Sequence, residues 1–322
     1  MDVKTKFLNG NLEEEVYMKQ PEGFSSSGGE HLVCKLKKSI YGLKQASRLS
    51  QETYINKVLE RFWMKDCSPS IAPIVKGDRF NLEQCLKNDL EREQMKNIPY
   101  AYAVGSLMYV QVCTRPDIEF SIGMLGRYQS NPGINHWKAA KKVMRYLQGT
   151  KDYMLMYRRT DNLVVISSSD LDSTSCIDSR KSTSGYVFML VGGVVYWKSA
   201  KQTLIATSTM EAEFVSCFEA TSHGVWLNSF ISWLRVVDSI SRPLKIYCDN
   251  SVAVFMAKNN KSRSRNKHID IKYLALRERV KEKTMVIEHF STKLMIVDPL
   301  TKSMPPLKFK DHVDRLGLGS FE

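Results

Sequence analysis

The sequence has no run of the roughly 18 or more apolar residues that a membrane-spanning helix needs. The stretch that begins Met1-Asp2-Val3-Lys4 also lacks the apolar core of a secretory leader, so neither membrane insertion nor secretion is predicted. No Cys-x-x-Cys pair occurs, and the seven cysteines are scattered along 322 residues. An odd, dispersed set of thiols disfavours a zinc site or a disulfide framework and favours reduced cysteines in an intracellular protein.

Acidic residues are the minority among the charged ones. The chain has 47 Lys and Arg against 34 Asp and Glu, which gives a formal net charge of +13. This excess favours a polyanionic partner, with nucleic acid as the first hypothesis, although positive charge can also serve solubility alone. Hydrophobic residues make up 43% of the chain, an ordinary globular composition with room for two domains.

Strand signals dominate the middle of the chain. Three apolar runs rich in Val, Ile, Tyr and Phe follow one another between residues 163 and 197, and Gly192-Gly193 between the last two predicts a tight hairpin turn. Ser208 then fits the N-cap of a helix, with Glu211 three residues later as in a capping box. This region is therefore predicted to form three successive strands followed by a helix.

A fourth apolar strand is predicted at Leu244–Asp249, after that helix. A strand, a helix and a further strand favour a right-handed crossover and a parallel pairing with an earlier strand. If the partner is the strand at Leu163–Ile166, Asp170 and Asp249 emerge at the same carboxyl edge of the sheet. Open α/β sheets usually place their chemistry at that edge.

Several short motifs occur in a fixed order over this part of the chain: Ser169–Asp172, Asp178–Tyr186, Trp197-Lys198, Ser208–Phe214, Ile246–Asn250, Lys267–Ile271 and Asp298–Lys302. In this order they resemble the ribonuclease H domain of copia-type retrotransposon polyproteins. The resemblance implies an α/β fold, a ribonuclease H-like mixed sheet flanked by helices. It also implies a nuclease that cleaves the RNA strand of RNA/DNA hybrids.

The resemblance further implies the catalytic residues, because four carboxylates match the family's metal ligands: Asp170, Glu213, Asp249 and Asp298. Two divalent ions held by hard oxygen ligands can activate a water and stabilise the leaving oxygen of a phosphodiester. Carboxylate ligands predict Mg²⁺, with Mn²⁺ as a substitute. Glu211 and Glu213 are rotated by about 200° on a helix and cannot both face one site. Glu211 is therefore assigned the capping role, and Glu213 matches the family's catalytic glutamate.

A basic segment follows the fourth strand. By resemblance, Asn250 and nearby backbone amides are placed to read the 2′-hydroxyl of the RNA strand. The further residues predicted to contact the hybrid are Lys258, Lys261, Arg263, Arg265, Lys267 and His268. A solvated loop explains this charge run equally well. His268 is equally consistent with proton transfer near the phosphate and with a structural or nucleic-acid contact.

Residues 1–48 resemble the N-terminal part of the reverse transcriptase of the same elements, on the motifs Met1–Gly10, Tyr17–Phe24 and Ser39–Arg48. In that family the aspartate matching Asp2 binds metal together with a Tyr-Val-Asp-Asp hairpin, a sequence that does not occur here. Arg48 instead runs into Leu49, which resembles a segment beyond the hairpin. We infer an internal deletion and expect polymerase activity to be lost, since two metal ions need more than one carboxylate.

Helices are predicted between residues 49 and 150, in a thumb- and connection-like segment. Apolar spacing predicts them at residues 54–62, at Ala101–Val112 and at Asn135–Gly149, whereas residues 77–97 are expected to be mobile or loosely packed. The last helix carries aromatic and basic residues that could contact a nucleic-acid backbone or form a solvated amphipathic face: Trp137, Lys138, Lys141, Lys142, Arg145 and Tyr146. The predicted domains are residues 1–48, a reverse transcriptase fragment; 49–150, helical; and 151–322, ribonuclease H-like.

Ser167-Ser168-Ser169 and Ser173-Thr174-Ser175 stand where the family usually has aromatic and small residues around the first catalytic aspartate. Losing an aromatic from a core strand removes apolar burial worth about 2–3 kcal/mol and would loosen Asp170. This departure favours an alternative, a catalytically inert retroelement relic that only binds nucleic acid, whereas the intact carboxylates favour a nuclease. The expected location is the cytoplasm, within a virus-like particle, or the nucleus. The sequence carries no signal for an oligomeric state.

Overall fold

The computed structural model describes residues 11–19, 33–38, 47–78, 80–157, 166–172, 178, 181–190, 192–203, 208–233, 243–258, 267–291 and 295–320. Its backbone alone is described at residues 11–19, 33–38, 47–48, 166–172, 232, 267–271 and 273. Near the N-terminus, β1 (Asn11–Lys19) and β2 (Val33–Lys38) pair antiparallel as a two-stranded sheet. None of the helices in the described ranges has the length and apolar character that a bilayer crossing requires.

The helical part contains α2 (Glu52–Arg61), α3 (Asp89–Met95), α4 (Tyr100–Cys113), α5 (Glu119–Leu125) and α6 (Ile134–Gly149). Short 3-10 turns lie at Leu82–Gln84, Pro116–Ile118 and Gly126–Tyr128. The helices predicted from apolar spacing are confirmed as α2, α4 and α6. On α2 the residues at that spacing, Ile55, Val58 and Leu59, are buried because they form the stripe that packs on the other helices.

Residues 77–97 are mostly exposed, as expected of a loosely packed segment, but a capped helix and two buried apolar side chains hold them in place. Asn88 caps α3, since its side chain accepts a hydrogen bond from the Glu91 backbone N–H at 2.8 Å. Phe80 and Met95 are both buried in the main core. Two well-placed apolar anchors are therefore enough to hold a largely polar segment. The short helix α5 was not predicted, because most of its residues are buried and no polar face marks its period.

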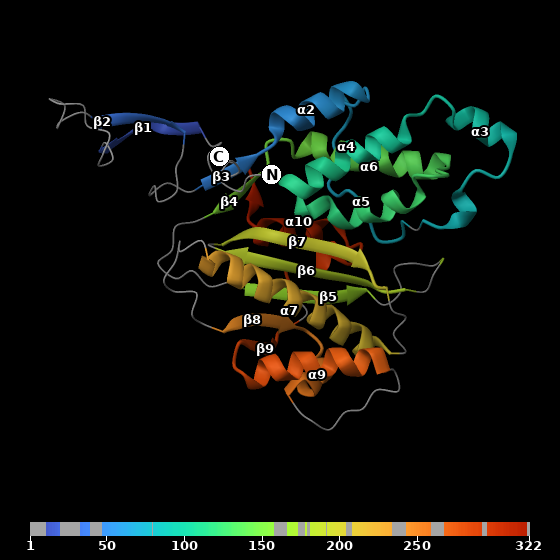
Figure 1. Cartoon of the computed structure of the whole chain (residues 1–322). Coiled ribbons are helices and arrows are strands. Elements are labelled where there is room, and N and C mark those ends of the chain that lie inside the picture. Colours follow the sequence, from blue (N-terminus) through green and yellow to red (C-terminus); the bar gives the residue numbers. More distant parts are fainter. Residues whose placement is uncertain are drawn as a thin grey trace.

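Five strands form the central sheet, β5 (Ile166–Asp172), β6 (Thr183–Leu190), β7 (Gly193–Lys201), β8 (Leu244–Cys248) and β9 (Met285–His289). Their order is β7-β6-β5-β8-β9, with β5, β6 and β7 antiparallel and β8 and β9 parallel to β5. This is the ribonuclease H-like mixed sheet that the motifs imply, and the predicted parallel pairing of the strand at Leu244–Asp249 with an earlier strand is confirmed. Figure 1 shows the helical part beside the β7 edge.

The strand expected at Leu163–Ile166 continues past its predicted end. Described β5 begins at Ile166, and Asp170 lies within it rather than after it. Residues 163–165 lie outside the described ranges. The apolar run ends at Ile166, but the serine-rich stretch that follows also pairs with β6. Main-chain hydrogen bonds hold a strand whatever its side chains, so a polar segment can occupy the centre of a sheet.

Helix α7 (Thr209–Trp233) lies on one face of the sheet, and its core contacts include Phe188 of β6 and Leu244 of β8. Gly224 allows this approach, since a Cβ there would lie 2.4 Å from a Leu244 methyl group. The predicted cap at its start is confirmed: the Glu211 backbone N–H donates to Ser208 Oγ at 3.2 Å. Helices α8 (Ser251–Lys258) and α9 (Lys267–Lys281) follow β8 on the way to β9.

The C-terminal segment packs on the sheet and on the helical part together. It contains the 3-10 turn η6 (Asp298–Leu300), α10 (Pro306–Arg315) and β10 (Leu318–Gly319). β10 pairs with β4 (Met154–Tyr157), which also pairs with β3 (Ser47–Ser50) in a three-stranded sheet. One core cluster joins the helical part to the sheet and the C-terminus, with members that include Leu107, Leu147, Val187, Leu300 and Leu316.

This shared packing crosses the predicted domain boundary at residue 150. Asp178, in one of the ribonuclease H-like motifs, accepts hydrogen bonds from Tyr128 Oη and from the Leu82 backbone N–H, both at 3.0 Å. A fragment that begins at residue 151 would lose those partners and expose the apolar side of the common core. The division at 150 stays a prediction, and experiments on this protein need the full chain.

A buried ion pair joins the turn after α4 to α6. Arg115 is fully buried and binds the Asp117 carboxylate with Nε and Nη2 at 3.0 and 2.7 Å. Its Nη1 donates to the Thr150 carbonyl at 2.8 Å, and Tyr146 Oη donates to Asp117. Tyr146 is therefore a core residue and not part of a nucleic-acid track. Trp137 likewise packs against core Phe62, with ring centroids 6.5 Å apart.

Glu119, on α5, connects the helical part to the edge strand β7. Its Oε1 accepts a hydrogen bond from the Ser199 backbone N–H at 3.0 Å, while its buried Oε2 has no hydrogen-bond partner in the described part of the chain. Burial raises the pKa of Glu119 to about 7, against the smaller lowering effects of the Ser199 hydrogen bond and of Lys198. The carboxyl group therefore changes charge near neutral pH.

The raised pKa predicts that stability falls as pH rises. Between the ordinary value of 4.5 and about 7, the folded chain keeps a proton on Glu119 that the unfolded chain has released. The free energy of unfolding should therefore fall through that range by up to about 3 kcal/mol. Glu119→Gln, which stays neutral, should gain stability relative to the wild type by that amount between about pH 5 and pH 8 in urea unfolding. Exposed Glu282→Gln should leave the pH dependence unchanged, and an unchanged Glu119→Gln profile would contradict the prediction.

Candidate functional site

The parallel strands β5 and β8 end side by side. Ser169 pairs with Cys248, so Asp170 and Asp249 each follow directly after a paired residue. As predicted, their backbones reach the same carboxyl edge of the sheet. Asp170 also pairs with Gly185 of β6, which leaves it between two neighbouring strands. The side chain of Asp170 lies outside the described part of the structure.

Helix α7 brings Glu213 to this edge. One donor atom each from Glu213, Cys248 and Asp249 lie within 4.8 Å of one another. Glu213 is 7% exposed and Asp249 is half-buried, so both carboxylates lie partly out of water. The structure thus brings together two of the four predicted metal ligands, from a helix and a strand that are far apart in sequence.

Cys248 is a member of this group that the sequence analysis missed. Neighbouring residues of a strand point to opposite faces, so a cysteine directly before Asp249 is expected to face away from it. Asp249 lies just past the end of β8, in a bend, and this alternation no longer applies there. The Cys248 thiol donates to the Asn250 carbonyl at 3.9 Å and hydrogen-bonds with Cys217. The hydrogen bond with Cys217 and the burial of the thiol raise the pKa of Cys248.

Asp298 lies on a different element, at the start of η6, and does not join the group of Glu213, Cys248 and Asp249. Lys302 Nζ lies 3.0 Å from its Oδ1, as an ion pair with the residue one turn later. The turn nevertheless packs on β6, the strand next to β5, because a Cβ on Gly185, the pairing partner of Asp170, would lie 3.3 Å from Leu300 Cβ. Asp298 as a fourth ligand stays a prediction.

The residues predicted to contact nucleic acid are described only in part. Asn250 Oδ1 accepts hydrogen bonds from the Val252 and Ala253 backbone N–H groups at 3.0 Å, so this oxygen caps α8. Lys258 is exposed at the end of α8. Lys267 and His268 begin α9 with only their backbone described, and the remaining three lie outside the described residues: Lys261, Arg263 and Arg265.

A histidine that the sequence analysis did not consider lies at this edge. His289, at the end of β9, places Nε2 3.0 Å from the backbone oxygen of Asp249. The contact holds the backbone of the residue that carries a candidate ligand. No motif marks His289, since it becomes a neighbour of Asp249 only when β9 pairs with β8.

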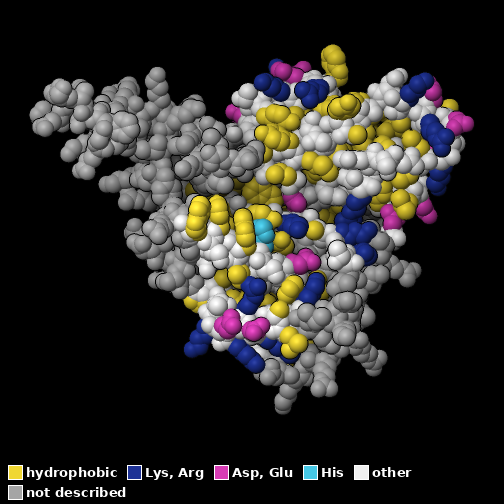
Figure 2. Space-filling model, in the orientation of Figure 1, with side chains coloured by type: hydrophobic (Ala, Val, Ile, Leu, Met, Phe, Trp, Pro, Cys, Tyr) yellow, Lys and Arg dark blue, Asp and Glu magenta, His cyan; other side chains and the backbone are white. Residues whose placement is uncertain are grey.

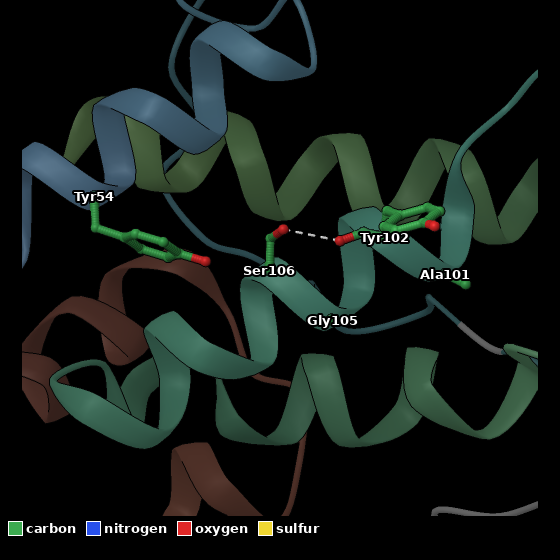
Figure 3. A pocket seen from close by; sticks show the side chains of 5 residues that line it. All are labelled: Tyr54, Ala101, Tyr102, Gly105 and Ser106. Atoms are coloured by element: carbon green, nitrogen blue, oxygen red, sulfur yellow. Dashed lines mark hydrogen bonds between the residues drawn. The ribbon is translucent and has the colours of Figure 1, made fainter.

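A separate hollow of about 400 Å³ lies on the helical part, lined by Tyr54, Ala101, Tyr102, Gly105 and Ser106 (Figure 3). Ser106 Oγ donates to the Tyr102 carbonyl at 2.9 Å, so its hydroxyl is engaged within the helix. The lining has no carboxylate, imidazole or thiol. Figure 2 shows hydrophobic side chains gathered over this part of the surface. The hollow therefore lacks the groups for hydrolysis, and the carboxylate group at the sheet edge is the candidate site.

Comparisons with known proteins agree with this organisation. Residues 1–49 match the family model described as reverse transcriptase (RNA-dependent DNA polymerase). The chain is 33% identical, over 411 aligned residues, to the Retrovirus-related Pol polyprotein from transposon TNT 1-94 of Nicotiana tabacum, with 99% of this chain covered. It is also 46% identical over 133 residues to Secreted RxLR effector protein 161 of Plasmopara viticola. That alignment covers 41% of this chain and 94% of the relative.

Among solved structures, LC11-RNase H1 in complex with RNA/DNA hybrid is 16% identical, with 42% of this chain and 93% of that chain covered at a TM-score of 0.32. The fold assignment stands on the strand order given above. The chain combines a ribonuclease H-like sheet with a match to a reverse transcriptase family. This combination is typical of one class of proteins, the polyproteins of retroelements. Over nearly its whole length the chain is homologous to the copia-type retrotransposon Pol polyproteins, and it spans 31% of the length of the TNT 1-94 polyprotein.

Proposed function

We propose that this chain is a divalent-metal-dependent endoribonuclease of the ribonuclease H type that cleaves the RNA strand of RNA/DNA hybrids. The observation that carries the proposal is the meeting of Glu213 and Asp249 at the carboxyl edge of β5 and β8, with donor atoms within 4.8 Å. Asp170 reaches the same edge by strand pairing. The net charge of +13 suits a polyanionic substrate.

The donors fit hard cations, because carboxylate oxygens are the ligands that Mg²⁺ and Mn²⁺ prefer. Asp170, Glu213 and Asp249 would hold the ions at the sheet edge, and Asp298 would join them from η6 if it left Lys302. A pair of such ions supplies a water activated near neutral pH and stabilises the charge on the leaving oxygen. The chain itself orients the carboxylates, through the α7 helix, the β5–β8 pairing and the His289 contact to Asp249.

Loss of polymerase activity is the second part of the proposal. The aligned region with the TNT 1-94 polyprotein is 411 residues long, more than the 322 residues of this chain, so the relative has residues without a counterpart here. The reverse transcriptase match ends at residue 49, next to the inferred junction of Arg48 and Leu49. In the structure β3 spans this junction and leads into α2. Asp2 then has no Tyr-Val-Asp-Asp partner in the sequence.

The test is cleavage of a labelled RNA/DNA hybrid by the full chain in Mg²⁺. We expect internal cuts in the RNA strand, no cuts in a matched DNA duplex, and no activity with EDTA, because the reaction needs the metal and the 2′-hydroxyl marks the strand. Primer extension on an RNA template should give no product. Cutting of both duplexes at equal rates would contradict the substrate proposal.

One observation favours an inert relic that only binds nucleic acid. Lys302 pairs with Asp298 at 3.0 Å, so an ammonium group occupies the side of this carboxylate that a cation would need. If the chain binds the hybrid more weakly as salt rises but does not cleave it in Mg²⁺ or Mn²⁺, the inert relic is the correct alternative. Lys302→Ala should then leave the chain inactive, whereas recovery of cleavage would show that the lysine blocks a competent site.

A further inference from the structure

The sulfur atom beside the carboxylates has no part in the proposed magnesium chemistry. Cys248 is fully buried at the end of β8, and its Sγ belongs to the same group of donors as the Glu213 and Asp249 oxygens, all within 4.8 Å of one another. Cys217 lies on α7, one helical turn after Glu213, and it hydrogen-bonds with Cys248. A thiol and two carboxylates from two elements therefore surround one point.

A mixed set of one sulfur and two oxygens favours a different class of cation from Mg²⁺. Mg²⁺ prefers oxygen ligands, whereas Zn²⁺ and Cd²⁺ bind thiolate and carboxylate together. Zinc bonds of about 2.3 Å to sulfur and about 2.1 Å to oxygen place tetrahedral ligands roughly 3.6 Å apart. The donors of Glu213, Cys248 and Asp249, all within 4.8 Å of one another, therefore already lie close to the spacing that a bound zinc ion needs.

We propose that Cys248, Glu213 and Asp249 form a binding site for Zn²⁺ and similar thiophilic divalent cations, and that such an ion inhibits the nuclease by displacing Mg²⁺. Binding forms a bond from Cys248 Sγ to the metal and releases the thiol proton to water, since a coordinated thiol is deprotonated. The inhibitory role rests on the proposed function. The cation site itself rests only on the three donors, and it has a readout independent of catalysis.

The experiment is a Cd²⁺ titration of the reduced full chain, followed by the ultraviolet charge-transfer absorption of a cadmium–thiolate bond. The wild type should show a saturable band that excess Zn²⁺ removes. Cys248→Ser should lose the band and bind Zn²⁺ at least about tenfold more weakly in equilibrium dialysis. Cys67→Ser, at a cysteine of the helical part, is the matched control and should keep both properties.

Asp249→Asn provides a second variant at a half-buried position, in case a serine inside β8 disturbs folding. It keeps the thiol but loses one charged oxygen, so the Cd²⁺ band should remain at higher metal concentrations only. Unchanged Cd²⁺ and Zn²⁺ binding in both variants would overturn the cation site. Zinc binding that Mg²⁺ does not weaken would overturn the inhibition. A wild type with the Cd²⁺ band but no cleavage in Mg²⁺ would refute the nuclease alone and leave the cation site standing.

Discussion

Replacing Asp249 by asparagine should reduce cleavage of the RNA/DNA hybrid by at least about 10²–10³-fold, because it removes a negative oxygen ligand from the proposed metal site. The structure places Asp249 with Glu213 in one donor group, just past the end of β8. Asparagine has nearly the same shape and the position is half-buried, so the fold should persist. The measurement is the initial cleavage rate in Mg²⁺, with thermal unfolding recorded on the same samples.

Glu288→Gln is a matched control for that experiment. Glu288 lies on the adjacent strand β9, pairs in register with Tyr247, and carries an exposed carboxylate 3.9 Å from Lys245. An exposed pair of this kind contributes about 0–1 kcal/mol, so its loss should leave folding and cleavage nearly unchanged. Cleavage by Asp249→Asn within about threefold of the wild type would exclude the Glu213–Asp249 group as the catalytic site.

Arg115→Met should lower the free energy of unfolding by about 3–5 kcal/mol, the largest loss of stability expected of a single substitution here. The guanidinium group is fully buried and is bound to Asp117 and to the Thr150 carbonyl. Removing it leaves the Asp117 carboxylate in the core without its counter-ion, and such a charge is costly to bury. Urea unfolding of the full chain measures the difference.

A double variant tests whether the stranded charge causes the loss. Arg115→Met combined with Asp117→Leu removes both charges and should recover much of the stability, because apolar residues often replace a buried pair at little cost. Lys142→Met is the control, since Lys142 and Asp78 pair at 2.7 Å with side chains 28% and 31% exposed. Its effect should stay within about 1 kcal/mol. An equal loss in the single and double variants would assign the effect to packing instead.

Local signals predicted many of the elements around the candidate site. The spacing of Ile55, Val58 and Leu59 marks α2, and Ser208 marks the start of α7, as the hydrogen bond from the Glu211 backbone N–H confirms. The apolar run at Leu244–Cys248 marks β8. Such signals act over one or two turns or along a single strand, so they can be recognised without knowing what each element packs against. They fail where burial removes the period, as in α5.

The strand–helix–strand pattern was enough to predict that Asp170 and Asp249 reach one edge of the sheet. Two contacts were visible only in the folded chain: Cys248 lies beside Glu213 and Asp249, and Lys302 pairs with Asp298. The physical reason is that these neighbours depend on the bend after β8 and on the packing of η6 against β6. Both follow from contacts between elements that are distant in the chain, and no local pattern of residues encodes them.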